Sequence, residues 1–209
     1  MNDFSNEVCA VILTGGKSSR MGGGIKSLKK FNNKLIFDRI FENLQNQVKK
    51  IIINSNDFEN LFINYNVEII KDSIKGFLGP LAGIHAALEW LTENEPHIKW
   101  LISVPGDTPF IPNDLVKQLL DKAKKDKHQI VLAQSNKKTH PIIGLWHLSL
   151  YQSLKNDLNS GVRKILDWAS KHQLGYVEFA NFKYDPFFNI NFKEDIIKAQ
   201  EIENNYLKK

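Results

Sequence analysis

Apolar runs in the first two-thirds of the chain alternate with segments in which apolar residues recur at helical spacing. The run Val8–Leu13 is short and continuously apolar, as expected for a strand buried on both faces. Similar runs follow at Lys50–Ile53, Val67–Ile70, Trp100–Val104 and Ile130–Ala133. Apolar residues at i, i+3 and i+4 predict amphipathic helices at Leu35–Leu44, Leu81–Leu91 and Leu115–Ala123. This alternation predicts an α/β fold with a mainly parallel, twisted sheet flanked by helices.

The last third of the chain is less regular. We expect a strand at Pro141–Trp146, helices within 147–171 and a final helix that begins at Lys193 or Glu194. No internal repeat or low-complexity linker divides the sequence, so we interpret residues 1–209 as a single domain. Within it, residues from about 135 to 192 form an elaboration of the alternating part.

Composition and charge narrow the class of protein. The 209 residues are 42% hydrophobic and 24% charged, which is usual for a globular protein. The single Cys9 excludes an internal disulfide, and no apolar run approaches the roughly 20 residues of a membrane helix. We therefore expect a cytoplasmic protein with no membrane partner. The net charge of +5 comes mostly from scattered lysines, with three arginines, which favours an anionic small substrate over nucleic acid.

A glycine-rich loop follows the first strand, with five glycines between residues 15 and 24. Glycine lets the backbone approach a bulky ligand and turn its N–H groups inward. Arg20 and Lys26 add two cations suited to a triphosphate. A Walker A loop would need glycine where the chain has Val11, and the dinucleotide fingerprint G-x-G-x-x-G is absent. The loop therefore predicts a phosphate site of another kind.

Polar residues follow several of the other predicted strands. Asp107 comes just after Trp100–Val104, and a lone carboxylate at a strand end suits Mg²⁺, which completes its shell with water and phosphates. The alternative is an ordinary aspartate in a proline-flanked turn. Asn54 and Asp72 end neighbouring strands and can hydrogen-bond the edges of a base or a ribose. We expect these side chains to share one edge of the sheet.

Three further features each allow two interpretations. Gly79–Gly83 opens the helix Leu81–Leu91, so its amides can face a ligand, or it is an ordinary proline-started entry. His140 is a lone histidine, which is usually structural. Arg163 suits a phosphate contact or a solvated helix face. The histidines follow no ligand spacing, so we predict no zinc site.

The glycine-rich loop carries a specific resemblance. Leu13-Thr14-Gly15-Gly16-x₃-Arg20-Met21-Gly22…Lys26 is similar to the L-x-G-G-x-x-x-R-M-G…K signature of the molybdenum cofactor guanylyltransferases. Later segments agree in order and spacing, over about residues 8 to 200: Asn54, Asp72, Gly79 to Gly83, Pro105 to Pro109, His140-Pro141, Gly161 to Arg163 and Asn189 to Asn191. The resemblance implies a Rossmann-like nucleotidyltransferase fold, in which residues of about 135–192 lie on the substrate side.

The same resemblance implies an activity and a set of site residues. GMP would pass from GTP to the terminal phosphate of molybdopterin with one Mg²⁺, releasing pyrophosphate. Asp107, Arg20 and Lys26 would be catalytic, with Asp107 on the metal. The GTP contacts would be Leu13, Thr14, Gly15, Gly16, Lys26, Asn54, Asp72, Gly83 and Asp107. Candidates for the pterin or for metal-bound water are His140, Arg163, Asn189 and Asn191. Molybdenum-insertion proteins and molybdoenzyme chaperones are the expected protein partners.

Two positions bear on which member of this group the chain resembles. Ile25 stands where family members commonly have an aspartate before the lysine. Gly15 stands where the cytidylyltransferase relatives typically have alanine, and the missing Cβ gives room for a purine. We expect GTP to be the substrate. The alternatives are a molybdopterin cytidylyltransferase, a sugar-phosphate nucleotidyltransferase, and a GTP-binding accessory protein without catalysis.

Overall fold

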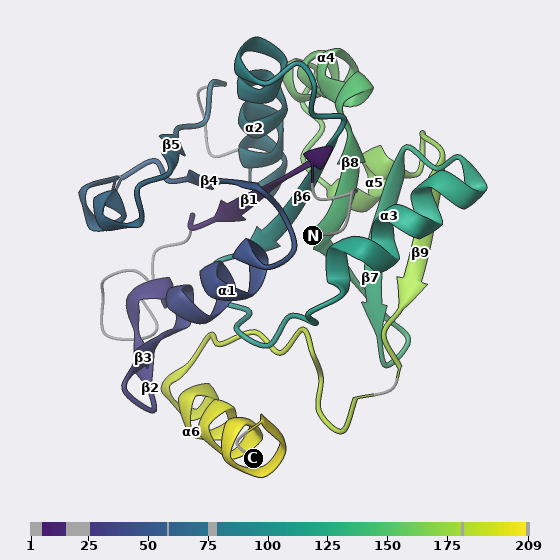
Figure 1. The fold of residues 1–209 in the computed structure, drawn as a ribbon. Helices are drawn as coiled ribbons and strands as arrows, with labels where there is room; N and C mark the ends of the chain where they lie inside the picture. The colour runs from purple at the N-terminus through teal and green to yellow at the C-terminus, as the bar shows by residue number, and fades with distance from the viewer. Residues whose placement is uncertain (1–5, 16–25, 58, 75–78, 181, 208–209) are drawn as a thin grey trace.

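A seven-stranded sheet forms the centre of the molecule (Figure 1). The computed structural model describes residues 6–15, 26–57, 59–74, 79–180 and 182–207. The strands lie in the order β5 (Glu68–Ile70), β4 (Lys50–Asn54), β1 (Val8–Leu13), β6 (Trp100–Pro105), β8 (Lys138–His147), β7 (Ile130–Ser135) and β9 (Leu174–Glu178). Among these strands, β8 alone runs against its neighbours β6 and β7. The predicted α/β fold with a mainly parallel sheet is confirmed.

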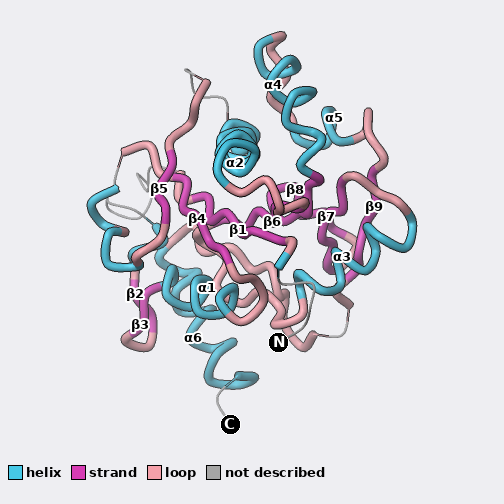
Figure 2. The backbone as a smooth tube through the Cα atoms, turned by 45° about the horizontal axis from the view of Figure 1, so that its top comes forward, coloured by secondary structure: helices cyan, strands magenta, loops and turns pink. Residues whose placement is uncertain are grey.

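Helices cover both faces of this sheet (Figure 2). One face carries α2 (Pro80–Asn94), α4 (Tyr151–Asn159) and α5 (Ile165–Ala169), and the other carries α1 (Ile36–Gln45), α3 (Leu115–Asp126) and α6 (Lys193–Ile202). The fully buried strand β1 serves both layers, because successive side chains point to opposite faces. Val8, Ala10 and Ile12 join one hydrophobic core, and the residues between them join the other.

The predicted elements agree with the structure in the regular part of the chain and less well after it. The five apolar runs are strands, the three amphipathic segments are helices, and the last α-helix begins at Lys193 as predicted. The strand predicted at Pro141–Trp146 extends over Lys138–His147. Strand β9 was missed, because it lies at the sheet edge and its exposed residues leave no continuous apolar run.

The hairpin β2 (Lys30–Phe31) and β3 (Lys34–Leu35) was also missed. Its strands are two residues each, too short for a period-2 pattern to be visible. The turn between them, Asn32 and Asn33, has positive φ at both positions, 46° and 62°. Asparagine tolerates that left-handed conformation, so the pair Asn-Asn was the available signal for the turn.

The parallel strands bring distant parts of the sequence to one edge of the sheet. Leu13, the last residue of β1, lies between Asn54 of β4 and Pro105 of β6, and Asn54 pairs with Ile70 of β5. The loops that follow β1, β4, β5 and β6 therefore start next to one another at this edge. Within the described residues, no helix is long and apolar enough to cross a membrane.

Candidate active site

Hydrogen bonds join the ends of β1, β4 and β6 where the glycine-rich loop begins. The amide of Gly106 donates to the carbonyl of Leu13 at 2.9 Å. Thr14 donates from both its amide and its hydroxyl to the carbonyl of Asn54, at 3.1 and 2.8 Å. Thr14 is buried, whereas Gly15 beside it is exposed. The chain thus leaves the sheet at a fixed point and presents Gly15 to solvent.

Asn54, Asn56 and Asp72 form a hydrogen-bonded cluster at the ends of β4 and β5. The side-chain amide of Asn54 donates to one carboxylate oxygen of Asp72 at 3.0 Å. Asn56 donates to the other oxygen at 2.9 Å, and its own side-chain oxygen accepts from the backbone amide of Asp72. The structure therefore brings the two predicted nucleoside contacts, Asn54 and Asp72, into direct contact. Asn56 was missed, although its place two residues after Asn54 was a signal.

Gly83 allows α2 to approach this cluster closely. A Cβ built on Gly83 would lie 2.5 Å from the side-chain oxygen of Asn54 and 2.8 Å from Cδ2 of Leu13. Both distances are shorter than real Cβ contacts, so any other residue here would displace one of these neighbours. The absence of a Cβ at Gly83 therefore leaves the space that the side chain of Asn54 occupies.

Lys26 and Asp107 lie together on the β6 side of the same edge. The ammonium of Lys26 is 3.7 Å from one carboxylate oxygen of Asp107 and donates to the side-chain oxygen of Asn191 at 2.5 Å. The amide of Ile190 donates to the backbone carbonyl of Asp107 at 3.0 Å. Lys26, Asp107 and Asn191, each more than 80 positions from the next in sequence, therefore form one cluster.

Asp107 is an acid in an environment that disfavours its charge. Burial raises the pKa of its carboxyl, although Lys26, its own backbone amide and the Asn189 side chain act to lower it. Its Oδ1 is buried and has no hydrogen-bond partner within the described residues. A buried carboxylate oxygen without a partner is costly, and a bound cation would satisfy it.

His140 belongs to a polar network with Ser135 and Asp185. Its Nε2 is 2.7 Å from the hydroxyl of Ser135, which donates to the carboxylate of Asp185, also at 2.7 Å. Asp185 in turn accepts from the amide of Phe187, whose ring lies against that of His140. Burial lowers the pKa of His140, which favours the neutral ring. His140 thus helps to hold the segment that carries Asn189 and Asn191.

The structure separates Arg163 from these clusters and does not describe other predicted residues. The guanidinium of Arg163 donates to the carbonyls of Leu158 and Val162, both at 2.7 Å, so it closes the carboxyl end of α4. Gly16, Arg20 and Ile25 lie outside the described residues. Ser135 and Asp185 were missed, and their sequence context held no signal for the network that they form.

The described site has two polar ends with different chemistry. Asn54 and Asp72 offer neutral and acidic hydrogen-bonding groups, whereas Lys26 and Asp107 offer a cation and a buried carboxylate. The exposed Gly15 leaves the sheet between the strands that carry these two ends. Such a site suits a ligand with hydrogen-bonding edges at one end and negative charge at the other.

A family model described as the MobA-like NTP transferase domain matches residues 10–174, which is most of the chain. The chain belongs to this family. The match includes Lys26, Asn54, Asp72 and Asp107 and ends before Asn189 and Asn191. In this family member, residues beyond the matched region therefore contact the lysine and the aspartate within it.

Relatives of this family member agree with that assignment over nearly the whole chain. A molybdenum cofactor guanylyltransferase of Nitrobacter hamburgensis is 38% identical over 193 residues, 92% of each chain. Another of that name, from Shewanella halifaxensis, is 34% identical and covers 96% of this chain and 98% of its own. The structure of molybdopterin-guanine dinucleotide biosynthesis protein A from Archaeoglobus fulgidus matches with a TM-score of 0.77 and 25% identity, covering 94% and 98%.

Replacing Gly83 by alanine should damage the nucleoside end of the site. Overpacking against Asn54 and Leu13 should cost about 1–3 kcal/mol of stability, which offsets or outweighs the roughly 1 kcal/mol by which alanine stabilises a helix relative to glycine. We expect Gly83→Ala to lower the Tm and to weaken guanosine binding, measured by calorimetry. Gly15→Ala is the control for stability, because its Cβ meets no described atom within 4 Å. A Gly83→Ala protein as stable as the wild type would contradict this role.

Asp107→Asn should stabilise the protein without ligands. The folded pKa of Asp107 lies above its ordinary value of 3.8, so folding disfavours the charged form. The gain from asparagine should therefore develop as the pH rises through the folded pKa and vanish below 3.8. We therefore expect a higher Tm than that of the wild type at pH 7 and an equal Tm below pH 3.8. Asp167→Asn, at a side chain 69% exposed, is the control and should leave the Tm unchanged. A lower Tm for Asp107→Asn would contradict the prediction.

Proposed function

We propose that this protein transfers GMP from GTP to the terminal phosphate of molybdopterin, releasing pyrophosphate. The observation that carries the proposal is the contact of Lys26 with both Asp107 and Asn191, beside the start of the glycine-rich loop. The names of the relatives agree with this reaction. The acidic and amide groups of Asn54 and Asp72 supply a separate end for the guanosine.

The reaction forms one phosphorus–oxygen bond and breaks another. An oxygen of the molybdopterin phosphate attacks the α-phosphorus of GTP, and the oxygen that bridges to the β-phosphorus departs with pyrophosphate. A phosphate dianion is already nucleophilic, so no general base is needed. Catalysis then depends on holding the reactants in line and on offsetting charge. Lys26 would offset phosphate charge, joined by Arg20, which lies outside the described residues.

The site also fits one magnesium ion. Mg²⁺ is usually held by one or two carboxylates, with water and phosphate oxygens in its other positions. Asp107 would hold it, because its buried Oδ1 lacks a partner in the described structure and its side chain lies beside Lys26. When bound, the ion would draw negative charge from the phosphates. The amide groups of Asn189 and Asn191 would orient its water ligands.

In the cytoplasm, the product would pass to molybdenum-insertion proteins or molybdoenzyme chaperones.

Nucleotide choice tests this proposal most directly. A site that pairs the N1–H, N2–H₂ and O6 groups of guanine would leave its own polar atoms unsatisfied with cytosine. We expect GTP to be preferred over CTP by at least roughly 100-fold in kcat/KM, or about 2.7 kcal/mol. The measurement is pyrophosphate release with molybdopterin, Mg²⁺ and each of the four nucleotides.

Each alternative gives a different result in that assay. Equal or faster turnover with CTP would indicate a cytidylyltransferase and overturn the choice of GTP. Turnover with a sugar phosphate in place of molybdopterin would overturn the choice of acceptor. Tight GTP binding without turnover, when the molybdopterin is confirmed to be intact, would favour an accessory protein. Asp107→Asn is the matched inactive variant, and it should release no pyrophosphate above background.

A further inference from the structure

The C-terminal helix α6 is bonded at its beginning to the site. The carboxylate of Asp195 accepts from the amides of Asn191 and Phe192, both at 2.9 Å, which fixes the backbone just before the helix. From that position the side chain of Asn191 reaches Lys26. The first turn of α6 therefore holds the residue that contacts the predicted phosphate-binding lysine.

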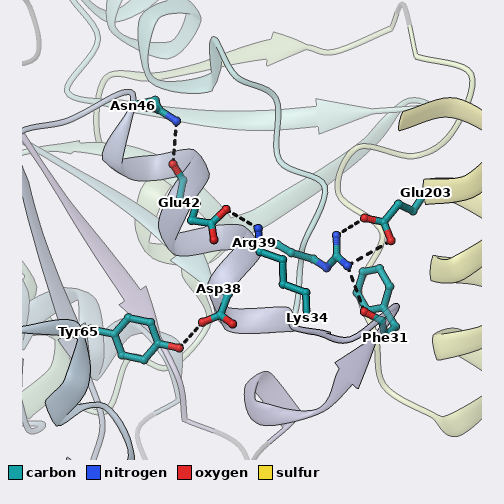
Figure 3. Close-up of polar contacts among 8 residues, drawn as sticks. All are labelled: Phe31, Lys34, Asp38, Arg39, Glu42, Asn46, Tyr65 and Glu203. Carbon is teal, nitrogen blue, oxygen red and sulfur yellow. Dashed lines mark hydrogen bonds and ion pairs between the residues drawn. The ribbon is translucent and has the colours of Figure 1, made fainter. Parts of the chain in front are cut away.

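The far end of α6 is bonded to the segment that follows Lys26 in sequence. Glu203, just after the helix, forms a two-bond ion pair with Arg39 of α1, and one of these bonds, Nη2 to Oε2, measures 3.1 Å (Figure 3). The same Nη2 of Arg39 donates to the carbonyl of Phe31 at 3.1 Å. The guanidinium also lies 3.9 Å from the centre of the Phe31 ring. Asn32 in the hairpin turn donates to Glu203 at 2.6 Å.

The ion pair of Arg39 with Glu203 is more buried than that of Lys34 with Glu42, which Figure 3 also shows. The side chains of Arg39 and Glu203 are 12% and 13% exposed, whereas those of Lys34 and Glu42 are 36% and 57% exposed. Water screens an exposed ion pair, so it does little to fix the positions of its two side chains. An arginine and a carboxylate joined by two parallel hydrogen bonds fix each other's orientation. Arg39 and Glu203 therefore hold α6 against the hairpin in a defined position.

The hairpin is connected to Lys26 through the backbone. Lys26 lies in a helical turn that leads directly into β2, and the amide of Lys29 donates to the carbonyl of Lys26 at 3.0 Å. The amide of Ile36, where α1 begins, donates back to the carbonyl of Lys29 at 2.9 Å. The turn, the hairpin and the start of α1 are thus tied together over 11 residues, Lys26 to Ile36. A shift at Arg39 or Phe31 would move Lys26.

We propose that Arg39 and Glu203 are positioning residues that hold Lys26 beside Asp107 for its contact with phosphate. We call the helix α6 with these two residues and Asn191 the C-terminal brace. It is bonded to the Lys26 segment at both ends. Its α6, Asn191 and Glu203 lie beyond the region that the family model matches, whereas Arg39 lies within that region. The proposal rests on the proposed function in one respect, namely that the ligand of Lys26 is the triphosphate of GTP.

The first experiment compares binding of GTP with binding of guanosine by calorimetry. In Glu203→Gln, GTP should bind about tenfold more weakly and guanosine unchanged, because Asn54 and Asp72 lie at the other end of the site. In a Lys26→Ala protein, Glu203→Gln should cause no further loss, since it acts through the lysine. Equal weakening of GTP and guanosine, or a full additional loss without Lys26, would overturn the brace.

A double variant distinguishes a loss of GTP binding from a loss of folding. Removing one partner of a buried ion pair strands the other charge, whereas replacing both by apolar residues often leaves stability intact. Arg39→Met with Glu203→Met should therefore keep the Tm near that of the wild type and still weaken GTP binding about tenfold. Lys34→Gln, which breaks the exposed pair on the same hairpin and helix, is the matched control and should change neither. Normal GTP binding in the double variant would contradict the proposal.

Hydrogen exchange tests the brace without any nucleotide. The amides of Lys29 and Ile36 should exchange at least about fivefold faster in the double variant than in the wild type or in Lys34→Gln. Amides of β4 should be unchanged. Unaltered exchange at Lys29 and Ile36 would overturn the brace. Faster exchange in a protein whose wild type fails to bind GTP would support the brace and count against the proposed function alone.

Discussion

The carboxylate of Asp107 is buried, which disfavours its negative charge. Much of the surrounding structure depends on how that charge is offset. Lys26 lies 3.7 Å from one carboxylate oxygen, and Lys26 and the Asn189 side chain lower the pKa of the carboxyl, whereas burial raises it more. The remaining oxygen has no partner within the described residues. A buried charge that is incompletely offset costs stability, and such costs are common where a site is arranged for a charged ligand.

The groups that surround Asp107 come from opposite ends of the chain. Lys26 follows the glycine-rich loop, whereas Asn189 and Asn191 come from the segment before α6. The Ser135–Asp185–His140 network holds this segment from one side, and the ion pair of Glu203 with Arg39 holds it from the other. These contacts use side chains whose geometry is directional, so they fix where the segment lies as well as adding stability. The site is therefore completed by residues beyond the matched family region.

The cluster of Asn54, Asn56 and Asp72 depends on a different constraint, which is steric. Asn54 occupies the space that a Cβ of Gly83 would fill, and Asp72 and Asn56 fix its amide. The two ends share strand β1, because Leu13 pairs with Asn54 on one side and with Pro105 on the other. A ligand that contacts both ends would therefore lie across the carboxyl edge of the sheet, where ligands of open α/β folds usually bind.

The sequence by itself determined the elements whose signals are local. Continuous apolar runs identified β1, β4, β5, β6 and β7, and the parallel arrangement placed Asn54, Asp72 and Asp107 at one edge, because strand direction fixes where each strand ends. The polar edge strand β9 and the two-residue strands of the hairpin gave no such signal. Only the tertiary structure decided that Lys26 meets Asn191 across 165 positions and that Arg39 meets Glu203 across 164. Those contacts depend on how helices pack on the sheet and on the directions of single side chains, which no pattern of neighbouring residues encodes.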